Sequence, residues 1–273
     1  MEPMLTIALK AAQKAGVLLE RGFERLDLVK VEQKGTNDFV SEVDRNSEKE
    51  IIYHLSKAYP EHKFLGEESG VTGNPESDHE WIIDPLDGTT NFLHGIPHFA
   101  VSIACLYKGQ LEHAVVYDPV KREEFTASRG RGAMLNGRRL RVSDRRSFDG
   151  ALIGTGIPFN GFALEHIDEY TNCFKEIAGV SAGIRRPGSA ALDLAYVAAA
   201  RYDGFWEMSL KPWDTAAGLL LVKEAGGLIS DFRGGNQFLQ SGNVVCAAPK
   251  LFKPLLQIVE KHMGSVQAAA EAR

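Results

Sequence analysis

Two aspartates lie three residues apart around a proline in the stretch WIIDPLDGTTNFLHG, residues 81–95. The carboxylates of Asp84 and Asp87, with the Leu86 carbonyl between them, form an all-oxygen ligand set. Mg²⁺ prefers such ligands, whereas soft metals prefer sulfur and imidazole. The spacing differs from the D-x-D-x-D-G pattern of a calcium loop, so an EF-hand is not expected. The stretch therefore predicts a site for hard cations.

The residues beside the two aspartates predict how the carboxylates are aimed. Pro85 favours extended geometry at Asp84, and Gly88 permits backbone conformations that other residues resist. We expect a tight turn over residues 84–87 that directs both carboxylates into one space. The alternative is an ordinary surface turn, since Asp, Pro and Gly are common turn residues. The apolar run before the turn argues against that alternative, as does the threonine pair after it, which could begin a helix that favours phosphate.

Two further acidic segments could complete the site. GEESG places Glu67 and Glu68 between glycines, and KPWDTAAG places Asp214 at an expected helix N-cap. For the glutamates the alternative is a solvated loop, and for Asp214 it is a purely capping role. Capping and metal ligation are compatible, because a carboxylate has lone pairs for both.

Length and composition bound the class of protein. The chain has 273 residues, 44% of them hydrophobic and 25% charged, as in an ordinary globular domain. The net charge of -5 argues against a general nucleic-acid or membrane binder. No apolar run reaches membrane-spanning length, and the N-terminus lacks the pattern of a secretion signal. Cys105, Cys173 and Cys246 lie far apart, so we expect buried, reduced thiols and a cytoplasmic location.

Helical and extended patterns predict the elements that position these residues. Apolar residues recur at helical spacing over residues 4–23 and 44–59. From residue 81 to residue 143, strand patterns alternate with turn signals, including an Asn–Gly turn. Beyond about residue 150, strands and helices alternate along the chain. This order suggests helices layered against two sheets, and we expect the tail at residues 264–273 to fray.

The motifs GEES, WIIDPLDGTTNFLHG and PWDTAAGLLLVKEAGG, in that order, resemble those of the inositol monophosphatase family. The resemblance extends over nearly the whole chain, including KGTNDFVSEVD and GAMLNG, and is closest to the bacterial SuhB-type members. It implies a single domain over residues 1–273, a layered αβαβα sandwich with an α+β half (1–148) and an α/β half (149–273), usually as a homodimer. It also implies Mg²⁺-dependent hydrolysis of small phosphate monoesters, foremost myo-inositol 1-phosphate, with inhibition by lithium.

The resemblance assigns metal ligands by motif position. It implies that Glu67, Asp84 and the Leu86 carbonyl hold a first Mg²⁺. Asp84, Asp87 and Asp214 would hold a second, with Asp84 bridging, and a third, weaker ion would lie near Glu67. Phosphate monoesters hydrolyse very slowly unaided. Two cations roughly 3.5–4 Å apart can activate water and stabilise the leaving alkoxide.

By the same resemblance, Thr89 and Glu67 orient the attacking water, and the amides of Gly88 and Thr89 bind the phosphate. Glu207 matches the residue that contacts inositol hydroxyls. The resemblance thus implies three catalytic residues, Glu67, Asp87 and Thr89. It implies further substrate contacts from Arg185, Gly188, Ser189, Ala190 and Asp214. Lys34 and Asp44 would be supporting residues.

Several of these residues have a structural alternative. Glu207 could be a surface carboxylate on a strand, and Ser189 could be simply a helix N-cap. For Arg185 and its neighbour Arg186, a structural or interface ion pair is as good an explanation as substrate contact. His94 and His98 flank the aspartate motif, but an all-oxygen Mg²⁺ site needs no imidazole, so both are expected to be structural.

Two other functions share part of these features. Fructose-1,6-bisphosphatases and phosphonucleotide phosphatases have the same metal motif, although Glu207 and the compact length favour the inositol phosphatase. SuhB-type proteins are linked to bacterial transcription antitermination and ribosomal-RNA processing, so a regulatory role with transcription factors or RNA is the second. Residues 129–146 hold seven arginines but no aromatic residue for base stacking. We therefore expect a solvated sheet edge there, with Arg139 and Arg141 outward and Leu140 and Val142 inward.

Overall fold

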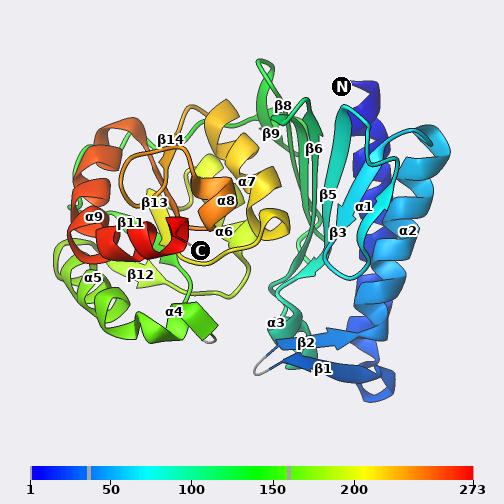
Figure 1. The fold of residues 1–273 in the computed structure, drawn as a ribbon, viewed down its shortest axis with the longest axis horizontal. Helices are drawn as coiled ribbons and strands as arrows, with labels where there is room; N and C mark the ends of the chain where they lie inside the picture. Colours follow the sequence, from blue (N-terminus) through cyan, green and yellow to red (C-terminus); the bar gives the residue numbers. More distant parts are fainter. Residues whose placement is uncertain (1, 36–37, 159–160, 273) are drawn as a thin grey trace.

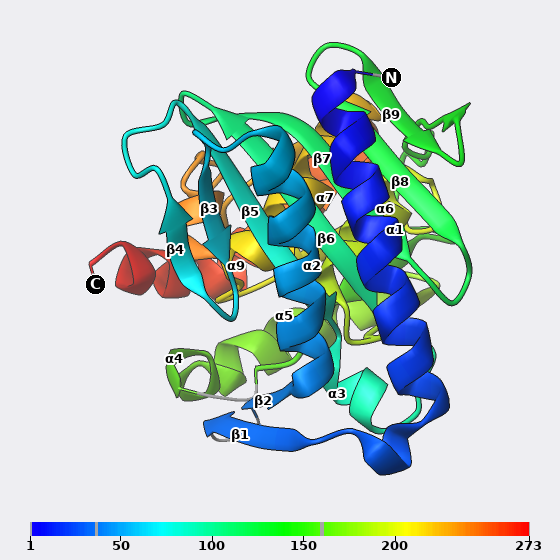
Figure 2. The same ribbon diagram turned by 90° about the vertical axis from the view of Figure 1, so that its right-hand side faces the viewer.

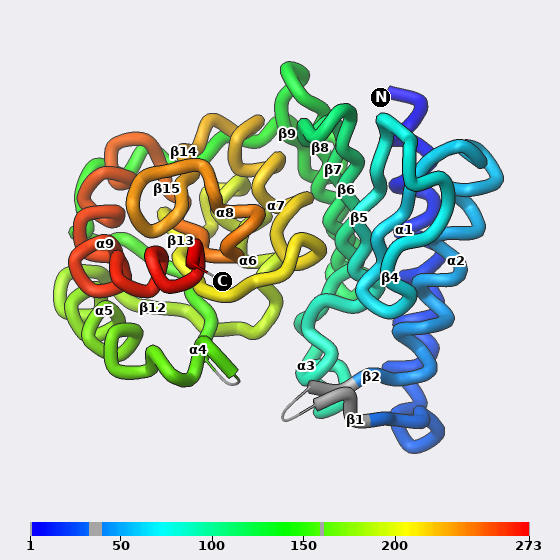
Figure 3. Tube along the Cα trace, in the orientation of Figure 1, coloured from blue at the N-terminus to red at the C-terminus, as the bar shows by residue number. Residues whose placement is uncertain are grey.

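A computed structural model describes residues 2–35, 38–158 and 161–272 (Figure 3). Its elements form five layers, three of helices and two of sheet (Figure 1). The first layer consists of α1 (Pro3–Glu24) and α2 (Glu42–Ala58), which lie side by side over one face of the larger sheet (Figure 2). Both helices agree with the helical spacing in the sequence, and α2 ends shortly before Pro60.

The larger sheet has eight strands in the order β10-β9-β8-β7-β6-β5-β3-β4. Neighbouring strands are antiparallel except β3 and β5, which run parallel. Successive residues of β5 face opposite layers, since Ile83 packs with α1 and α2 whereas Ile82 packs in the central core. The bounds are β3 (Lys63–Gly66), β4 (Gly70–Gly73), β5 (His79–Asp87), β6 (Ala100–Tyr107), β7 (Gln110–Asp118), β8 (Glu123–Ser128), β9 (Gly132–Leu135) and β10 (Arg138–Arg139).

The middle layer consists of α6 (Ala190–Ala198) and α7 (Pro212–Glu224), which lie between the two sheets (Figure 1). All nine residues of α6 are buried, as expected for a helix with a packing partner on every side. The second sheet has five strands in the order β12-β11-β13-β15-β14. Their bounds are β11 (Leu152–Thr155), β12 (Gly183–Arg185), β13 (Gly204–Glu207), β14 (Leu228–Ser230) and β15 (Val244–Ala247).

The outer layer consists of α5 (Ile167–Val180) and α9 (Pro249–Glu271), which cover the far face of the second sheet. One hydrophobic core lies between α1, α2 and the larger sheet, a second surrounds the middle helices between the two sheets, and a third lies between the second sheet and the outer helices. The predicted αβαβα sandwich is therefore confirmed. The short elements are η1 (Leu26–Leu28), β1 (Val31–Gly35), β2 (Asp38–Ser41), α3 (Thr89–Leu93), α4 (Gly161–Glu165) and α8 (Phe238–Ser241).

The C-terminal segment differs from the prediction of a frayed tail. Helix α9 continues to Glu271, and Val266 and Gln267 within it are fully buried. The Gln267 side chain accepts a hydrogen bond from buried Asn243 at 2.9 Å. The composition of the tail suggested fraying, but its apolar stripe packs against the second sheet, and such tertiary contacts outweigh local propensity.

Two further predictions from the sequence are confirmed, one for the arginine-rich stretch and one for the cysteines. The arginine-rich stretch has the predicted orientation: Arg139 and Arg141 are exposed, Leu140 is buried and Val142 is partly buried. All three cysteines are buried and free, as expected. Among the helices that the structure describes, none combines the length and the apolar character needed to cross a bilayer.

Candidate functional site

Strand β5 carries both central aspartates, with a β-bulge between them. Asp84 pairs with Ser102 of β6 and Asp87 pairs with Ala100, so β5 has one extra residue between these pairs. In a regular strand, residues three apart face opposite sides, and one extra residue brings them to the same side. The prediction of a tight turn over residues 84–87 was therefore wrong. Pro85, which cannot donate to the ladder, is accommodated in the bulge instead.

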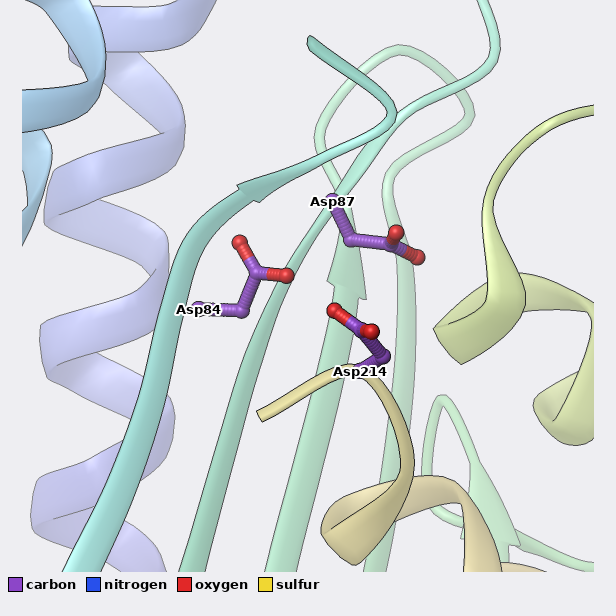
Figure 4. A group of neighbouring side chains, drawn as sticks. All are labelled: Asp84, Asp87 and Asp214. Atoms are coloured by element: carbon purple, nitrogen blue, oxygen red, sulfur yellow. The ribbon is translucent and has the colours of Figure 1, made fainter. Parts of the chain in front are cut away.

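The two aspartates meet a third from the middle layer (Figure 4). Asp84, Asp87 and Asp214 each offer a carboxylate oxygen, and these oxygens lie within 4.8 Å of one another. Asp214 lies in the first turn of α7, where its carboxylate accepts a hydrogen bond from the Lys211 amide at 2.7 Å. Lys211 is the N-cap, so the predicted N-cap role of Asp214 was wrong by position. The carboxylate still satisfies an amide at the helix start.

The electrostatics of this cluster indicate uncompensated negative charge. Burial raises the pKa of Asp84 well above its ordinary value, and the nearby charges of Glu67, Asp87 and Asp214 raise it further. Burial likewise raises the pKa of Asp214, with Asp87 next in effect, and raises the pKa of Asp87 to about 6. Like charges in a low-dielectric setting repel strongly. An all-oxygen group of this kind fits a divalent hard cation, whose charge would offset that repulsion.

Glu67 directly follows β3 and belongs to the same region. Its amide donates to the Ile83 carbonyl at 3.1 Å, which continues the pairing of β3 with β5 beyond the strand end. The charge of Glu67 acts on both Asp84 and Asp214. The loop after Glu67 is fixed by the Glu48 carboxylate of α2, which accepts hydrogen bonds from the amides of Glu68 and Ser69.

The Asp87 carboxylate also binds the start of α6. Its Oδ2 accepts hydrogen bonds from the Ser189 hydroxyl and from the Ala191 amide. Ser189 is the N-cap of α6, and its hydroxyl accepts from the Leu192 amide. One aspartate therefore joins the acidic cluster to the segment 188–190, which the resemblance implies to be part of the substrate pocket.

Thr89, Asp44 and Leu86 form a second hydrogen-bonded group beside the cluster. The Thr89 hydroxyl lies 3.1 Å from Asp44 Oδ1 and 3.0 Å from the Leu86 carbonyl oxygen, and its single proton can point to only one of them at a time. Asp44 is buried in the first turn of α2, where it accepts from the amide and hydroxyl of Ser41. Burial raises the pKa of Asp44, so this carboxylate holds a proton more readily than an exposed one.

Two glycines let the two sides of the site approach each other. Gly88 has φ +99°, and a Cβ there would lie 3.2 Å from the Gly188 carbonyl oxygen. Gly188 has φ +93°, and a Cβ there would lie 3.1 Å from the Asn91 amide nitrogen. That nitrogen donates to the carbonyls of His98 and Pro187, both at 2.8 Å. Sequence reasoning missed Asn91, although it lies inside the quoted motif.

Glu207 is the last residue of β13 and is partly buried. A Cβ at Gly156 would lie 1.7 Å from Glu207 Oε1, so the carboxylate rests directly against this glycine. Burial raises the pKa of Glu207 to about 8, the Asp87 charge adds to that rise, and Arg186 opposes it. The guanidinium of Arg185 instead donates to the Ile184 carbonyl at 3.1 Å. Arg186, rather than Arg185, is the arginine whose charge acts on Glu207.

The remaining predicted residues are placed as follows. Ala190 is the first residue of α6 and is buried. The predicted role of Lys34 depends on a side chain outside the described part of the structure. His94 is exposed at the end of α3. His98 is partly buried, and mainly for that reason its pKa falls to about 4.

The chain is similar to several known proteins along nearly its whole length. The model of the inositol monophosphatase family matches residues 1–264. Nus factor SuhB of Pseudomonas aeruginosa is 60% identical over 265 residues, which is 96% of this chain and 98% of that protein. The crystal structure of extragenic suppressor protein SuhB from Bartonella henselae has a TM-score of 0.92 at 45% identity, covering 95% of this chain and 99% of that one. The inositol monophosphate-bound structure of inositol monophosphatase II from Staphylococcus aureus has a TM-score of 0.81 at 26% identity, covering 100% and 99%.

Proposed function

Because the chain belongs to the inositol monophosphatase family, we propose that it is a Mg²⁺-dependent phosphatase of small phosphate monoesters, with myo-inositol 1-phosphate as its expected substrate. The observation that carries this proposal is the meeting of Asp84, Asp87 and Asp214 oxygens within 4.8 Å. These residues come from two layers and from segments that are far apart in the chain. The described cysteines are free thiols, as is usual in a reducing compartment, and we propose that the enzyme acts in the cytoplasm.

We propose that the three aspartates, with Glu67 and the Leu86 carbonyl, hold the magnesium ions. Bound Mg²⁺ would supply positive charge to the phosphoryl oxygens, acidify a water and stabilise the leaving oxygen. The bulge in β5 would bring the Asp84 and Asp87 side chains to the same side of the strand. The cap on α6 has the role of fixing Asp87 Oδ2, which leaves Oδ1 as the oxygen expected to face a cation.

We propose that Thr89 and Glu67 orient the attacking water, with Asp44 behind Thr89. When the Thr89 proton points to Asp44, the Thr89 oxygen can accept a hydrogen bond from the water. The raised pKa of Asp44 suits a group that takes up a proton during the reaction. In-line attack then needs only positioning and charge stabilisation from the surrounding groups.

Substrate recognition is assigned to the opposite side of the site. The amides of Gly88 and Thr89 begin α3 without intrahelical partners and are proposed to bind phosphate. Gly188, Ser189 and Ala190 would line the polyol pocket, and the Glu207 carboxylate would accept hydrogen bonds from polyol hydroxyls. The inositol monophosphate bound in the Staphylococcus aureus structure supports a ligand of this class. Arg185 would contact the ligand only after its guanidinium has released the Ile184 carbonyl.

The test is phosphate release from myo-inositol 1-phosphate with and without Mg²⁺. Fructose 1,6-bisphosphate and a 3′-phosphonucleotide, assayed in parallel, separate the inositol phosphatase from the related phosphatases. We expect Mg²⁺-dependent turnover that is fastest on the inositol ester and sensitive to lithium. No turnover of any of the three substrates by folded protein at saturating Mg²⁺ would reject the proposal. Sedimentation of the same sample tests the homodimer that we also propose.

A second role is proposed from the names of the relatives. The Pseudomonas aeruginosa relative is called a Nus factor, so we propose binding to transcription antitermination factors or RNA. Of the seven arginines in residues 129–146, three already form ion pairs within the chain, with Glu112, Glu2 and Asp203. Of the other four, Arg138, Arg139 and Arg141 are exposed and lie close together in the chain, and they are the side chains to test. Their triple alanine variant should weaken RNA binding at low salt, and unchanged binding would remove this stretch from the interface.

A further inference from the structure

Glu48 is a buried acid of α2 that binds the loop after β3. Its side chain is 2% exposed; its Oε2 accepts a hydrogen bond from the Glu68 amide at 2.9 Å, and its Oε1 accepts one from the Ser69 amide at 2.8 Å. Gly66, the last residue of β3, lies directly against this side chain, because a Cβ on Gly66 would fall within the space of the carboxylate. A carboxylate is costly to bury unless its oxygens accept hydrogen bonds, and both oxygens of Glu48 do so.

The need of the loop for hydrogen bonds does not by itself explain a buried acid. Ser69 is exposed and Glu68 is partly exposed, so water could accept from both amides. What the carboxylate adds is a fixed position for the loop. On the other side, the Glu67 amide donates to the Ile83 carbonyl at 3.1 Å. The backbone around Glu67 is therefore held by β5 on one side and by α2 on the other.

The same helix also holds Thr89. Asp44 lies one turn before Glu48, so the two buried carboxylates share one face of α2. Asp44 Oδ1 lies 3.1 Å from the Thr89 hydroxyl. Thr89 and Glu67 are the two groups proposed above to orient the attacking water. One regular helix thus contacts Thr89 directly and Glu67 through its loop, which fixes the separation of the two groups.

We propose that Glu48 is a positioning residue for Glu67: by holding the loop 66–69 against α2, it fixes the Glu67 carboxylate relative to the Thr89 hydroxyl. The loop backbone engages both oxygens of Glu48, so Glu48 acts through Glu67 rather than on the reacting atoms. Small displacements of such groups lower turnover strongly, because the reaction depends on their alignment. The inference rests on the proposed phosphatase function of this site.

The test replaces Glu48 by glutamine and measures Mg²⁺ binding and turnover separately. Glutamine has one oxygen acceptor and an NH2 donor, so E48Q can satisfy only one of the two loop amides. Calorimetry of metal-free protein should show Mg²⁺ binding weakened about tenfold, as is common when an outer partner of a metal ligand is lost. At saturating Mg²⁺, kcat for myo-inositol 1-phosphate should fall about 10- to 100-fold. KM should change less than about threefold, because Glu48 does not hold the groups proposed to bind the ester.

The matched control is D231N. Asp231 is 1% exposed and, like Glu48, accepts hydrogen bonds from backbone amides of a loop, but it follows β14 at the edge of the second sheet. D231N and E48Q should both lower the urea midpoint of unfolding, whereas D231N should keep the wild-type Mg²⁺ affinity and kcat. G66A reaches the same contact from the loop, since its methyl group would displace the Glu48 carboxylate, and it should reproduce the effects of E48Q.

Each outcome decides the inference. Wild-type Mg²⁺ affinity and kcat in E48Q overturn it, and so do equal losses in D231N, which would show an effect of stability alone. In an E67Q background, E48Q should lower kcat by less than about twofold further, and additive losses would also overturn the link. If E48Q does not fold, G66A carries the same expectations.

Failure of the proposed function gives a different result. Wild-type protein that binds Mg²⁺ but hydrolyses no phosphate ester would reject that function, and the Mg²⁺ affinities of the variants would still decide the role of Glu48. Wild-type protein that binds no Mg²⁺ would overturn both proposals.

Discussion

Asp87 Oδ2 accepts a hydrogen bond from the Ala191 amide at 2.8 Å, across 104 residues of sequence. The same oxygen accepts from the Ser189 hydroxyl, so one carboxylate group links the larger sheet to the first turn of α6. The acidic cluster and the segment proposed to hold the polyol are therefore oriented by one side chain. A disturbance at either position is expected to reach the other.

The substitution D87N tests the acidic cluster. Asparagine can still accept from the Ala191 amide through its carbonyl oxygen, but its NH2 group would then take the place of Oδ1, and a donor-only group cannot bind a cation. We expect kcat/KM with Mg²⁺ to fall about 1,000-fold or more, since a metal ligand contributes several kcal/mol to the transition state. Circular dichroism should show retained fold. A loss smaller than about tenfold would remove Asp87 from the proposed metal site.

The substitution S189A tests the link between α6 and Asp87. Loss of the N-cap should cost about 1 kcal/mol of unfolding free energy. Loss of the hydroxyl donor should weaken Mg²⁺ binding about tenfold, as outer partners of metal ligands do. S181A is the matched control, because the buried Ser181 hydroxyl has no partner among the described residues. Equal effects of both substitutions on Mg²⁺ affinity by calorimetry would contradict the link.

The dependence of stability on pH follows from the raised pKa values of the cluster. The pKa of Asp87 rises from 3.8 to about 6 on burial, and those of Asp84 and Asp214 rise in the same direction. In metal-free protein, a raised folded-state pKa gives stability that is present below the unfolded pKa, about 4, and is lost as pH rises through the folded value. Mg²⁺ binds the ionised form and competes with protons.

We therefore expect Mg²⁺ to stabilise the fold mainly above about pH 6. At about pH 7.5, a 100-fold excess over Kd should raise Tm by roughly 5 °C, whereas at about pH 5 the shift should be much smaller. Differential scanning fluorimetry in EDTA, with and without added Mg²⁺, measures both shifts. A Tm shift of equal size at the two pH values would contradict the assignment of the cluster as the Mg²⁺ site.

The substitution G156A tests the place of Glu207. A methyl group would lie 1.7 Å from Glu207 Oε1, so the carboxylate would have to move. We expect KM for an inositol phosphate to rise about tenfold and stability to fall by about 1–3 kcal/mol, as overpacking does. G179A in α5 is the control, because no heavy atom lies within 4 Å of its added Cβ. That variant should keep its kinetics and gain up to about 1 kcal/mol. Unchanged kinetics in G156A would separate Glu207 from the substrate.

The layers of the fold could be predicted from the sequence because each rests on local periodicity. The spacing of apolar residues predicts α1 and α2, and the glycines after α7 mark its end. The bulge in β5 was not predictable, because it depends on the register with β6, and register is set by pairing across the sheet. The buried end of α9 was missed for a similar reason, since Gln267 finds Asn243 only after the chain has folded.

The residues of the candidate site could likewise be predicted from the sequence only in part. Asp84 and Asp87 could be named from sequence because they lie beside Pro and Gly after an apolar run, and Asp214 because it lies at the start of an expected helix in a motif that resembles the family. Asn91 could not, since both carbonyls that it binds lie outside its own helix, at His98 and Pro187. Arg185 was preferred over Arg186 from motif position, but adjacent residues in extended chain point in opposite directions. The structure places the charge of Arg186, not that of Arg185, on Glu207.

The two edges of the larger sheet bear on aggregation. Its outermost strands are β10 and β4, and an open edge can pair with a strand of another molecule. β10 consists of only two residues, both exposed arginines, and β4 is a four-residue strand bounded by glycines with positive φ. Short strands and positive charge both discourage such pairing. The substitutions R138V and R139V together should increase light scattering during refolding at high protein concentration, whereas R141V, outside the strand, should not. Two of the arginines chosen above to test RNA binding are thus also placed where they would discourage edge-to-edge pairing between copies of this chain.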